Sequence, residues 1–406
     1  MSKQPQMRNP WCLAAFALLV APAAFAQPPA GGNPFAERAR TALAEPFIGI
    51  TTDGTADRGL FPIARTGVST EPVRRAAEGL LASSSEGQRA KMVFPVDDSE
   101  WRNWANIHRF PRQGVSLDEM TAEQRDAAYG LLRAALSERG FDTSRDIMRL
   151  NHHLAELVAN FGEYGEHLYF FTIMGTPSAT EPWGWQIDGH HLVINYFVLG
   201  DQVVMTPTFM GSEPVSAASG RYAGTAVLEV EQDSALAFMQ SLSDAQRRVA
   251  IVDPAKGSGA NLAEMFRDNV VVAYEGIAAT ALDKAQRDRL LELIAAYVGN
   301  MDAGHAAVKM EEIRAHLDTT YFAWKGEAGP DAVFYYRIQS PVIYIEFDHQ
   351  GPVALDGPRG VATRRHIHSV VRTPNGNDYG KDLLREHYAA YRDDPRHGHV
   401  ASANQK

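Results

Sequence analysis

The sequence predicts an α+β fold built from two similar halves, with helical hairpins packed on a largely antiparallel sheet. Three observations lead to this prediction: amphipathic helical segments, aromatic segments that alternate as strands do, and the recurrence of both in the same order. We therefore expect an internal tandem duplication of a helix–helix–strand–strand unit. The expected copies are residues 71–225 and 226–376, within one globular unit of residues 71–388.

Each predicted copy begins with two helices. The segment SSSEGQR (residues 83–89) resembles SLSDAQR (241–247), and each precedes an apolar run and a proline. The segment MTAEQRD (120–126) resembles LDKAQRD (282–288), and each continues as an amphipathic helix. The alternative is two unrelated helical hairpins that share capping preferences, because the threonine and aspartate at these helix starts are both good N-cap residues.

Strands are predicted to follow the helices in both halves. We expect the aromatic segments LYFFTI (residues 168–173) and VFYYRI (333–338) to occupy the same place in the two copies. The segments VVMTP (203–207) and VVRTP (370–374) form the next pair. Because these matches keep the order of the helix matches, the four together favour duplication over chance.

The first residues have the three parts of a secretory signal peptide. Lys3 and Arg8 precede an apolar run that ends in Ala-Phe-Ala. We expect cleavage after Ala26, which predicts a periplasmic or secreted protein. A leader and extension (residues 27–70) would follow, and the chain would end in a C-terminal helix and tail (377–406).

Cysteine content and charge exclude several classes of function. Cys12 is the only cysteine and lies in the predicted signal peptide, so the mature chain would have no disulfide and no thiolate ligand. The net charge is -10, and no basic cluster or basic amphipathic helix is present. We therefore expect no nucleic-acid partner and no membrane insertion after signal cleavage, and a small-molecule or oligomeric substrate instead. The oligomeric state is left open.

A candidate site is predicted where two strands carry histidines and carboxylates. His366 and His368 stand at positions i and i+2 of a predicted strand, so both imidazoles point to the same side. Such a pair commonly supplies two nitrogen ligands to one metal ion. The preceding strand carries Glu346 and Asp348, and we expect Glu346 to act as a fourth ligand or as a general base.

The third nitrogen ligand is expected from the segment PWGWQIDGHHL, as either His190 or His191. The site would then lie between the two halves and hold a divalent transition metal, with zinc favoured and copper as the alternative. Two other interpretations stay open for the His366–His368 pair: a metal-free network for acid–base catalysis, and a solvated strand face.

Further residues are candidates for contact with the substrate. Arg372 shares the face of the two histidines and is predicted to hold an anionic group through paired hydrogen bonds. An aromatic wall and a turn rich in hydrogen-bonding groups would complete the cleft; these substrate-binding candidates are Trp183, Trp185, Gln186, Asn377 and Tyr379. The catalytic candidates are Glu346, Asp348 and Arg372.

The motifs GHHL (residues 189–192), H-x-H (366–368) and NDYG (377–380) together resemble an uncharacterised bacterial family, the domain of unknown function numbered three thousand five hundred. The resemblance covers roughly residues 73–388. It implies one whole, recurrent domain, and it implies no substrate or reaction.

The sequence thus favours an exported metal-dependent enzyme, a hydrolase more than an oxidase. The signatures of nucleophile elbows, Walker loops, dinucleotide-binding loops and H-E-x-x-H metalloproteases do not occur. The alternatives are a non-catalytic ligand-binding protein that uses the same polar cleft and a histidine-ligated copper redox protein.

Overall fold

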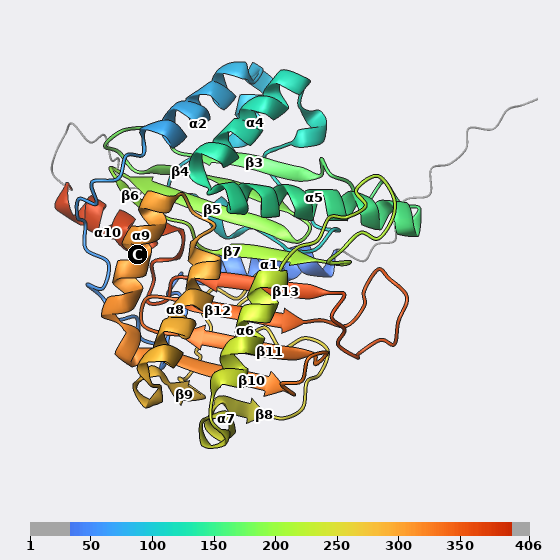
Figure 1. Cartoon of the computed structure of the whole chain (residues 1–406). Coiled ribbons are helices and arrows are strands. Elements are labelled where there is room, and N and C mark those ends of the chain that lie inside the picture. Colours follow the sequence, from blue (N-terminus) through green and yellow to red (C-terminus); the bar gives the residue numbers. More distant parts are fainter. Residues whose placement is uncertain (1–32, 392–406) are drawn as a thin grey trace, which may run out of the picture.

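A computed structural model describes residues 33–391 of the protein. The predicted signal peptide, residues 1–26, lies outside the described residues. Within these residues, a single sheet of thirteen strands is surrounded by ten α-helices and five short 3-10 helices (Figure 1).

The elements have the following bounds. The α-helices are α1 (Pro34–Ala44), α2 (Glu71–Ser83), α3 (Glu86–Met92), α4 (Ala122–Ala135), α5 (Glu138–Val158), α6 (Glu229–Ser241), α7 (Asp244–Ala250), α8 (Lys284–Val298), α9 (Ala303–Ala315) and α10 (Lys381–Ala390). The 3-10 helices are η1 (Ser99–Arg102), η2 (Leu117–Glu119), η3 (Ala279–Ala281), η4 (Leu317–Thr319) and η5 (Asp378–Gly380). The strands are β1 (Val93–Phe94), β2 (Val115–Ser116), β3 (Tyr169–Met174), β4 (Trp183–Gly189), β5 (Leu192–Leu199), β6 (Gln202–Val204), β7 (Thr208–Ser212), β8 (Ile251–Asp253), β9 (Ile277–Ala278), β10 (Tyr321–Gly326), β11 (Phe334–Gln339), β12 (Tyr344–His349) and β13 (Ile367–Arg372).

The sheet confirms the predicted α+β class with a mostly antiparallel sheet. Its strand order is β1-β3-β4-β5-β7-β13-β12-β11-β10-β8, with β2 added to β3, β6 to β5 and β9 to β10. Only the outer pairs β1–β3 and β8–β10 are parallel. The antiparallel strands β7 and β13 therefore meet at the centre, one from each half of the chain.

Strand order is the same on both sides of this central pair. Moving outward, β5, β4 and β3 lie on one side, and β12, β11 and β10 lie on the other. Both β3 and β10 pair with a short parallel strand, β1 or β8, and with a short antiparallel strand, β2 or β9. The places of β3 and β10 therefore correspond.

The predicted correspondence between strands of the two halves is wrong. LYFFTI overlaps β3, whereas VFYYRI overlaps β11, which lies one strand closer to the centre than β10. VVMTP belongs to β6 and the turn after it, whereas VVRTP begins in β13. Aromatic and β-branched residues are common in any strand with a buried face, so these residues mark burial rather than position in the fold.

The predicted helix starts are found, and all four are capping boxes. In each, the side chain of the N-cap residue accepts from the backbone of a glutamine whose own side chain bonds back; the pairs are Ser85–Gln88, Thr121–Gln124, Ser243–Gln246 and Asp283–Gln286. The glutamines also join the two boxes of each half: Gln88 Nε2 lies 3.1 Å from Gln124 Oε1, and Gln246 Nε2 lies 2.8 Å from Gln286 Oε1.

The sheet separates two layers. Helices α2, α4, α5, α6, α8 and α9 cover one face (Figure 1), where Trp183, Trp185 and Phe347 belong to the main apolar core. Irregular segments, α1 and α10 cover the other face (Figure 1), where Trp101 and Phe209 belong to a second core. Because side chains alternate along a strand, each central strand contributes to both layers.

Candidate metal centre

Three histidines meet on the face of the sheet that lies away from the main helical layer. His191 occupies the two-residue turn between β4 and β5, since Gly189 and Leu192 pair directly. It has a φ of 62°, a left-handed conformation that histidine adopts more readily than most residues. Hydrogen bonds from His191 N to Asn106 O (3.2 Å) and from Gly211 N to His191 O (2.8 Å) hold this turn.

His366 directly precedes β13, and His368 lies within β13 on the same side, as predicted from their spacing. Strand β7 lies between His191 and β13, and its Gly211 pairs with His368. A Cβ atom at residue 211 would lie 2.6 Å from Ile367 O and 3.3 Å from the His368 ring. The glycine therefore lets His368 lie close against β7.

The three imidazoles point their Nε2 atoms at one another. The distances are 3.0 Å between His366 and His368, 3.2 Å between His366 and His191, and 3.3 Å between His368 and His191. Two nitrogen ligands of one tetrahedral zinc ion lie about 3.3–3.4 Å apart, given zinc–nitrogen bonds of about 2.0–2.1 Å. The group of three buried histidines can therefore hold a metal ion.

Hydrogen bonds on the outer side of two rings fix which nitrogen carries the proton. His366 Nδ1 donates to Gly351 O at 2.8 Å, and His368 Nδ1 donates to Glu264 Oε1 at 2.6 Å. In a neutral imidazole, the Nε2 atom then keeps a free lone pair. Burial and the neighbouring His368 lower the pKa of His366 to about 3, so His366 is neutral at physiological pH.

Glu264 is a carboxylate that sequence reasoning missed. Burial acts to raise its pKa, but His368 and the Asn261 amide, 2.7 Å away, outweigh burial and lower it. Its side chain is 20% exposed and that of His368 is 11% exposed, so this is where the histidine group approaches solvent. No sequence signal pointed to Glu264, because it lies in an irregular segment far from His368 in the chain.

His190 lies beside the group rather than in it. Its ring stacks on His191 with centroids 3.9 Å apart, and its Nδ1 lies 2.8 Å from Asn151 Oδ1. Burial and the neighbouring His108 hold the pKa of His190 well below its usual value. Of the two candidates for the third ligand, the structure thus brings His191 to the site and directs His190 toward α5.

The structure does not bring Glu346 to the histidines. Its carboxylate accepts hydrogen bonds from Leu262 N (2.8 Å), Ala263 N (2.9 Å) and Tyr335 Oη (2.6 Å). Burial raises the pKa of Glu346 to about 7. It therefore anchors the segment that carries Glu264 rather than adding to the group of three.

Asp348 lies directly across from His368 in the sheet, but it also has other partners. Its carboxylate forms an ion pair with Lys256 at 2.8 Å and accepts from Ala260 N at 2.6 Å. Burial raises its pKa, although Lys256 opposes this. Asp348 thus anchors the same irregular segment as Glu346.

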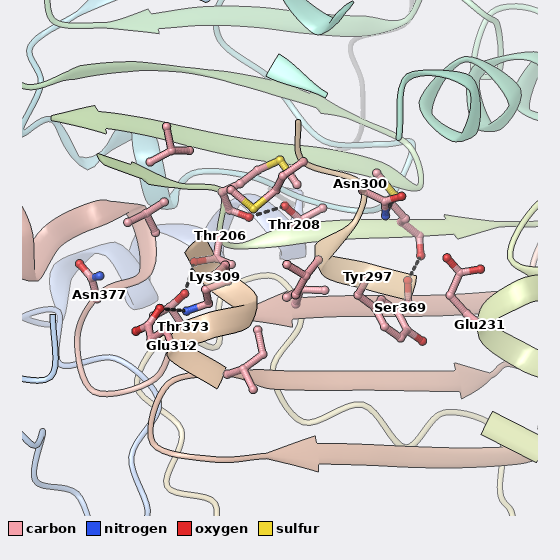
Figure 2. A pocket seen from close by; sticks show the side chains of 18 of the residues that line it. Thr206, Thr208, Glu231, Tyr297, Asn300, Lys309, Glu312, Ser369, Thr373 and Asn377 are labelled. Carbon is pink, nitrogen blue, oxygen red and sulfur yellow. Dashed lines mark hydrogen bonds and ion pairs between the residues drawn. The ribbon is translucent and has the colours of Figure 1, made fainter. Parts of the chain in front are cut away.

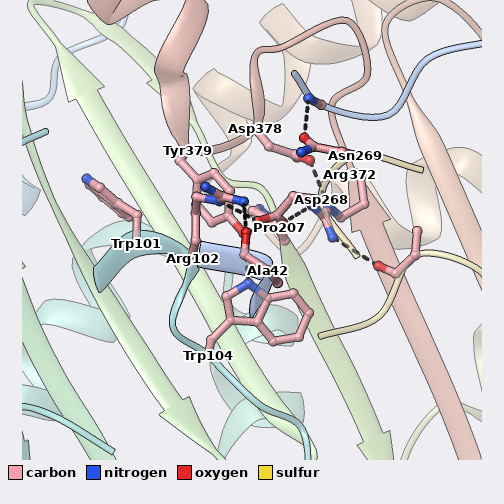
Figure 3. A network of polar contacts seen from close by, with 12 residues as sticks. Ala42, Trp101, Arg102, Trp104, Pro207, Asp268, Asn269, Arg372, Asp378 and Tyr379 are labelled. Atoms are coloured by element: carbon pink, nitrogen blue, oxygen red, sulfur yellow. Dashed lines mark hydrogen bonds and ion pairs between the residues drawn. The ribbon is translucent and has the colours of Figure 1, made fainter. Parts of the chain in front are cut away.

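Arg372 is held in a buried ion-pair network (Figure 3). Its guanidinium donates to Asp378 Oδ2 (2.7 Å), Asp268 Oδ1 (2.6 Å) and Ala263 O (3.0 Å). Arg102 donates to the other oxygen of Asp268 at 2.7 Å. Arg372 is fully buried, and each of its three nitrogens has a partner in the protein, so in this conformation it belongs to the ion-pair network rather than to the histidine group.

The five substrate-binding candidates are all buried, and none lies in the histidine group. Trp183 and Trp185 belong to the core on the helical side of the sheet. Gln186 donates to Asn195 Oδ1 at 2.7 Å. Tyr379 donates to Asp268 in the Arg372 network, and Asn377 lines a cavity on the helical side.

Comparisons with known proteins give a family and no function. Searches of curated proteins and of solved structures found no significant match. Within residues 33–391, no helix combines the length and the apolar character needed to cross a bilayer. Residues 66–381, most of the chain, match the model of the family described as Protein of unknown function (DUF3500), and the chain belongs to this family.

Proposed function

We propose that the protein is an exported metal-dependent hydrolase in which His191, His366 and His368 hold one zinc ion through their Nε2 atoms. The observation that carries the proposal is the convergence of three Nε2 atoms within 3.0–3.3 Å, two of them on rings whose Nδ1 hydrogens are already engaged. A zinc ion bound by three histidines keeps a fourth position for water and lowers the pKa of that water to near neutrality.

In this proposal the outer contacts position the ligands. Glu264 orients His368, and the carbonyl of Gly351 orients His366. The loop that presents Gly351 is held by Glu213, whose carboxylate accepts from three successive backbone amides, at Val353, Ala354 and Leu355. A small-molecule or oligomeric substrate would approach from the partly exposed side formed by His368 and Glu264.

The first test is elemental analysis of the purified chain that begins at Gln27, beside His366→Ala and His368→Ala. We expect about one metal ion per chain in the parent and its loss in both variants, with unchanged circular dichroism. His152→Ala, which removes a histidine of α5 outside the group, is the control and should keep the metal. No metal in the parent, even after incubation with zinc or copper, would overturn the proposal.

Reaction class and metal identity need separate measurements. Zinc with turnover of ester, amide or phosphate substrates would support the hydrolase, and we expect His368→Ala to lose that turnover by at least about a hundredfold. Copper with a visible or paramagnetic signal would instead support the histidine-ligated redox protein, because an all-imidazole site also suits copper. Metal without turnover of any kind would favour a binding protein.

Export is inferred from the signal-peptide pattern of residues 1–26, which the structure does not describe. N-terminal sequencing of the protein recovered from the periplasm or medium should begin at Gln27. A mature protein that retains Lys3 and Arg8 would contradict this inference.

We also infer a tandem duplication. It is supported by the equal order of strands on both sides of the β7–β13 pair and by the joined capping boxes. The boundaries of its two copies remain those proposed from the sequence, at residues 71–225 and 226–376.

A further inference from the structure

Figure 2 shows a cavity lined by side chains of the central strands and of the helices that cover them. Because side chains alternate along a strand, this cavity and the histidine group lie on opposite sides of β13. Along β13, His368 points toward the histidine group, while its neighbours Ser369 and Val371 line this cavity. Strands β6, β7 and β13 form one wall, and helices α8 and α9 form the other. The space open to the centre of a water molecule in this cavity is about 60 Å³, which is enough for several waters or for one small organic molecule.

Apolar side chains make up most of the wall. Three methionines, Met205, Met210 and Met301, line the cavity together with Leu228 and Ile343. Methionine side chains are flexible and polarizable, so they adapt to the shape of an aliphatic ligand.

Most hydroxyl and ammonium groups at the wall already have partners in the protein. Thr206 and Thr373 bond to each other through their Oγ1 atoms at 2.8 Å. Ser369 donates to Met210 O at 2.7 Å, and Lys309 donates to Val342 O at 2.8 Å. These groups therefore have less to gain from a ligand than a polar atom without a partner.

Two wall residues each keep a buried acceptor oxygen that has no hydrogen-bond partner among residues 33–391: Asn300 (Oδ1) and Glu312 (Oε1). Asn300 is only 3% exposed, and its Nδ2 makes one long contact, 3.6 Å to Met210 Sδ. The Glu312 side chain is 27% exposed, and its other oxygen accepts from Lys309. At the inner end, the Asn300 oxygen therefore faces no protein donor among the described residues, whereas Glu312 lies nearer the solvent.

We propose that this cavity binds a short aliphatic alcohol, whose hydroxyl donates to Asn300 Oδ1 while its chain packs among the three methionines. A buried acceptor without a partner costs free energy, and a hydroxyl donor removes that cost. A neutral hydroxyl suits the inner end better than an ammonium group, because burying a charge there would cost far more. The site is independent of the proposed metal centre, which lies across the sheet.

A pair of isomers tests the proposal. 1-Butanol and methyl propyl ether have the same atoms and similar shapes, but only the alcohol can donate. With the whole chain and ligand-detected NMR, we expect millimolar binding of 1-butanol and about tenfold weaker binding of the ether. Asn300→Leu keeps the size of the side chain and should bring the two affinities together, and Val371→Phe should fill the cavity and abolish both.

The wild-type protein provides a readout that does not depend on any variant folding. With methyl-labelled methionine, 1-butanol should shift the signals of Met205, Met210 and Met301 and leave that of Met92, in the α3 part of the core, unchanged. Absence of binding to wild type would mean that the cavity holds only water and would overturn the proposal. A preference for the alcohol that persists in Asn300→Leu would also overturn it.

Discussion

Two buried polar clusters lie on the same face of β13 and differ in how their hydrogen-bonding groups are matched. Around Arg372, donors meet acceptors: two guanidinium groups are paired with the carboxylates of Asp268 and Asp378. Around His366 and His368, the Nε2 lone pairs point at each other and at His191, and no lysine or arginine of residues 33–391 bonds to these atoms.

This difference separates a structural network from the proposed metal site. A buried cluster in which opposite charges are paired stabilises the fold only as long as every member is present. A cluster in which three ring nitrogens converge, two of them as acceptors, can pair at most one of the acceptors with a proton of the third ring, whereas a positive ion satisfies all three. Both clusters are buried, so burial alone does not tell them apart, whereas the pairing of donors with acceptors does.

The largest expected effect comes from removing Arg372 from its ion-pair network. Arg372→Met should lower the free energy of unfolding by about 3–5 kcal/mol, because it leaves Asp378 buried without its cationic partner and Asp268 with Arg102 alone. Urea unfolding of metal-free protein measures this loss. In the same assay His368→Ala should cost much less, and equal costs would contradict the distinction between the two clusters.

A smaller effect is expected at Glu264, which bonds to the outer nitrogen of His368 in the histidine group. Glu264→Gln should raise the dissociation constant for zinc by about 10–100-fold, because the amide orients His368 more weakly than the carboxylate. Competition with a chelator measures the constant, and Glu292→Gln, at an exposed position of α8, is the matched control. Unchanged affinity in Glu264→Gln would remove Glu264 from the proposed positioning role.

His349 is a buried histidine outside both clusters, and each of its ring nitrogens has a hydrogen-bond partner. Its Nδ1 accepts from Phe334 N at 3.0 Å, and its Nε2 donates to Gln232 Oε1 at 3.0 Å. Burial, with a smaller contribution from Arg364, lowers its pKa from 6.5 to about 3. The unfolded chain therefore binds a proton between these values that the folded protein does not.

Stability should therefore fall as the pH drops from about 6.5 toward 3, by about 1.4 kcal/mol per pH unit from His349 alone. Above pH 6.5 this contribution is constant. His349→Gln should lose about 2 kcal/mol less than the parent between about pH 6 and pH 4.5, as measured by urea unfolding in chelator. Equal losses in the two proteins would show that His349 is not the buried neutral group described.

Local periodicity explains which part of the site could be predicted. The two-residue period of β13 correctly placed His366, His368 and Arg372 on one face. Their partners could not be predicted, because Glu264 and Asp268 belong to an irregular segment without any period. Glu346 was expected at the metal because it lies in the neighbouring strand, but backbone amides of that irregular segment bind its carboxylate.

The same limit applies to the fold. The capping boxes were predictable because their residues are three positions apart in the sequence. The places of the aromatic strands were not, because β3 and β10 correspond through pairing with β1 and β8, which are distant in the chain. Sequence similarity between LYFFTI and VFYYRI reflected a shared burial requirement and gave the wrong pairing.

The smallest expected effect concerns the neutral hydrogen bonds of the glutamines in the capping boxes. Gln124 Nε2 donates to Ser83 O at 2.8 Å, and Gln286 Nε2 donates to Ser241 O at 3.0 Å, so the two glutamines make the same contacts in the two halves. Gln124→Ala and Gln286→Ala should each lower the free energy of unfolding by about 1 kcal/mol, and by similar amounts, because each removes neutral hydrogen bonds. Urea unfolding measures both, with the exposed Glu292→Gln as control. A large loss of stability in one half and none in the other would show that the two capping boxes do not stabilise the fold equally. That result would weaken the inferred duplication. It would also mean that the pairing of donors with acceptors matters for stability only where the groups are charged.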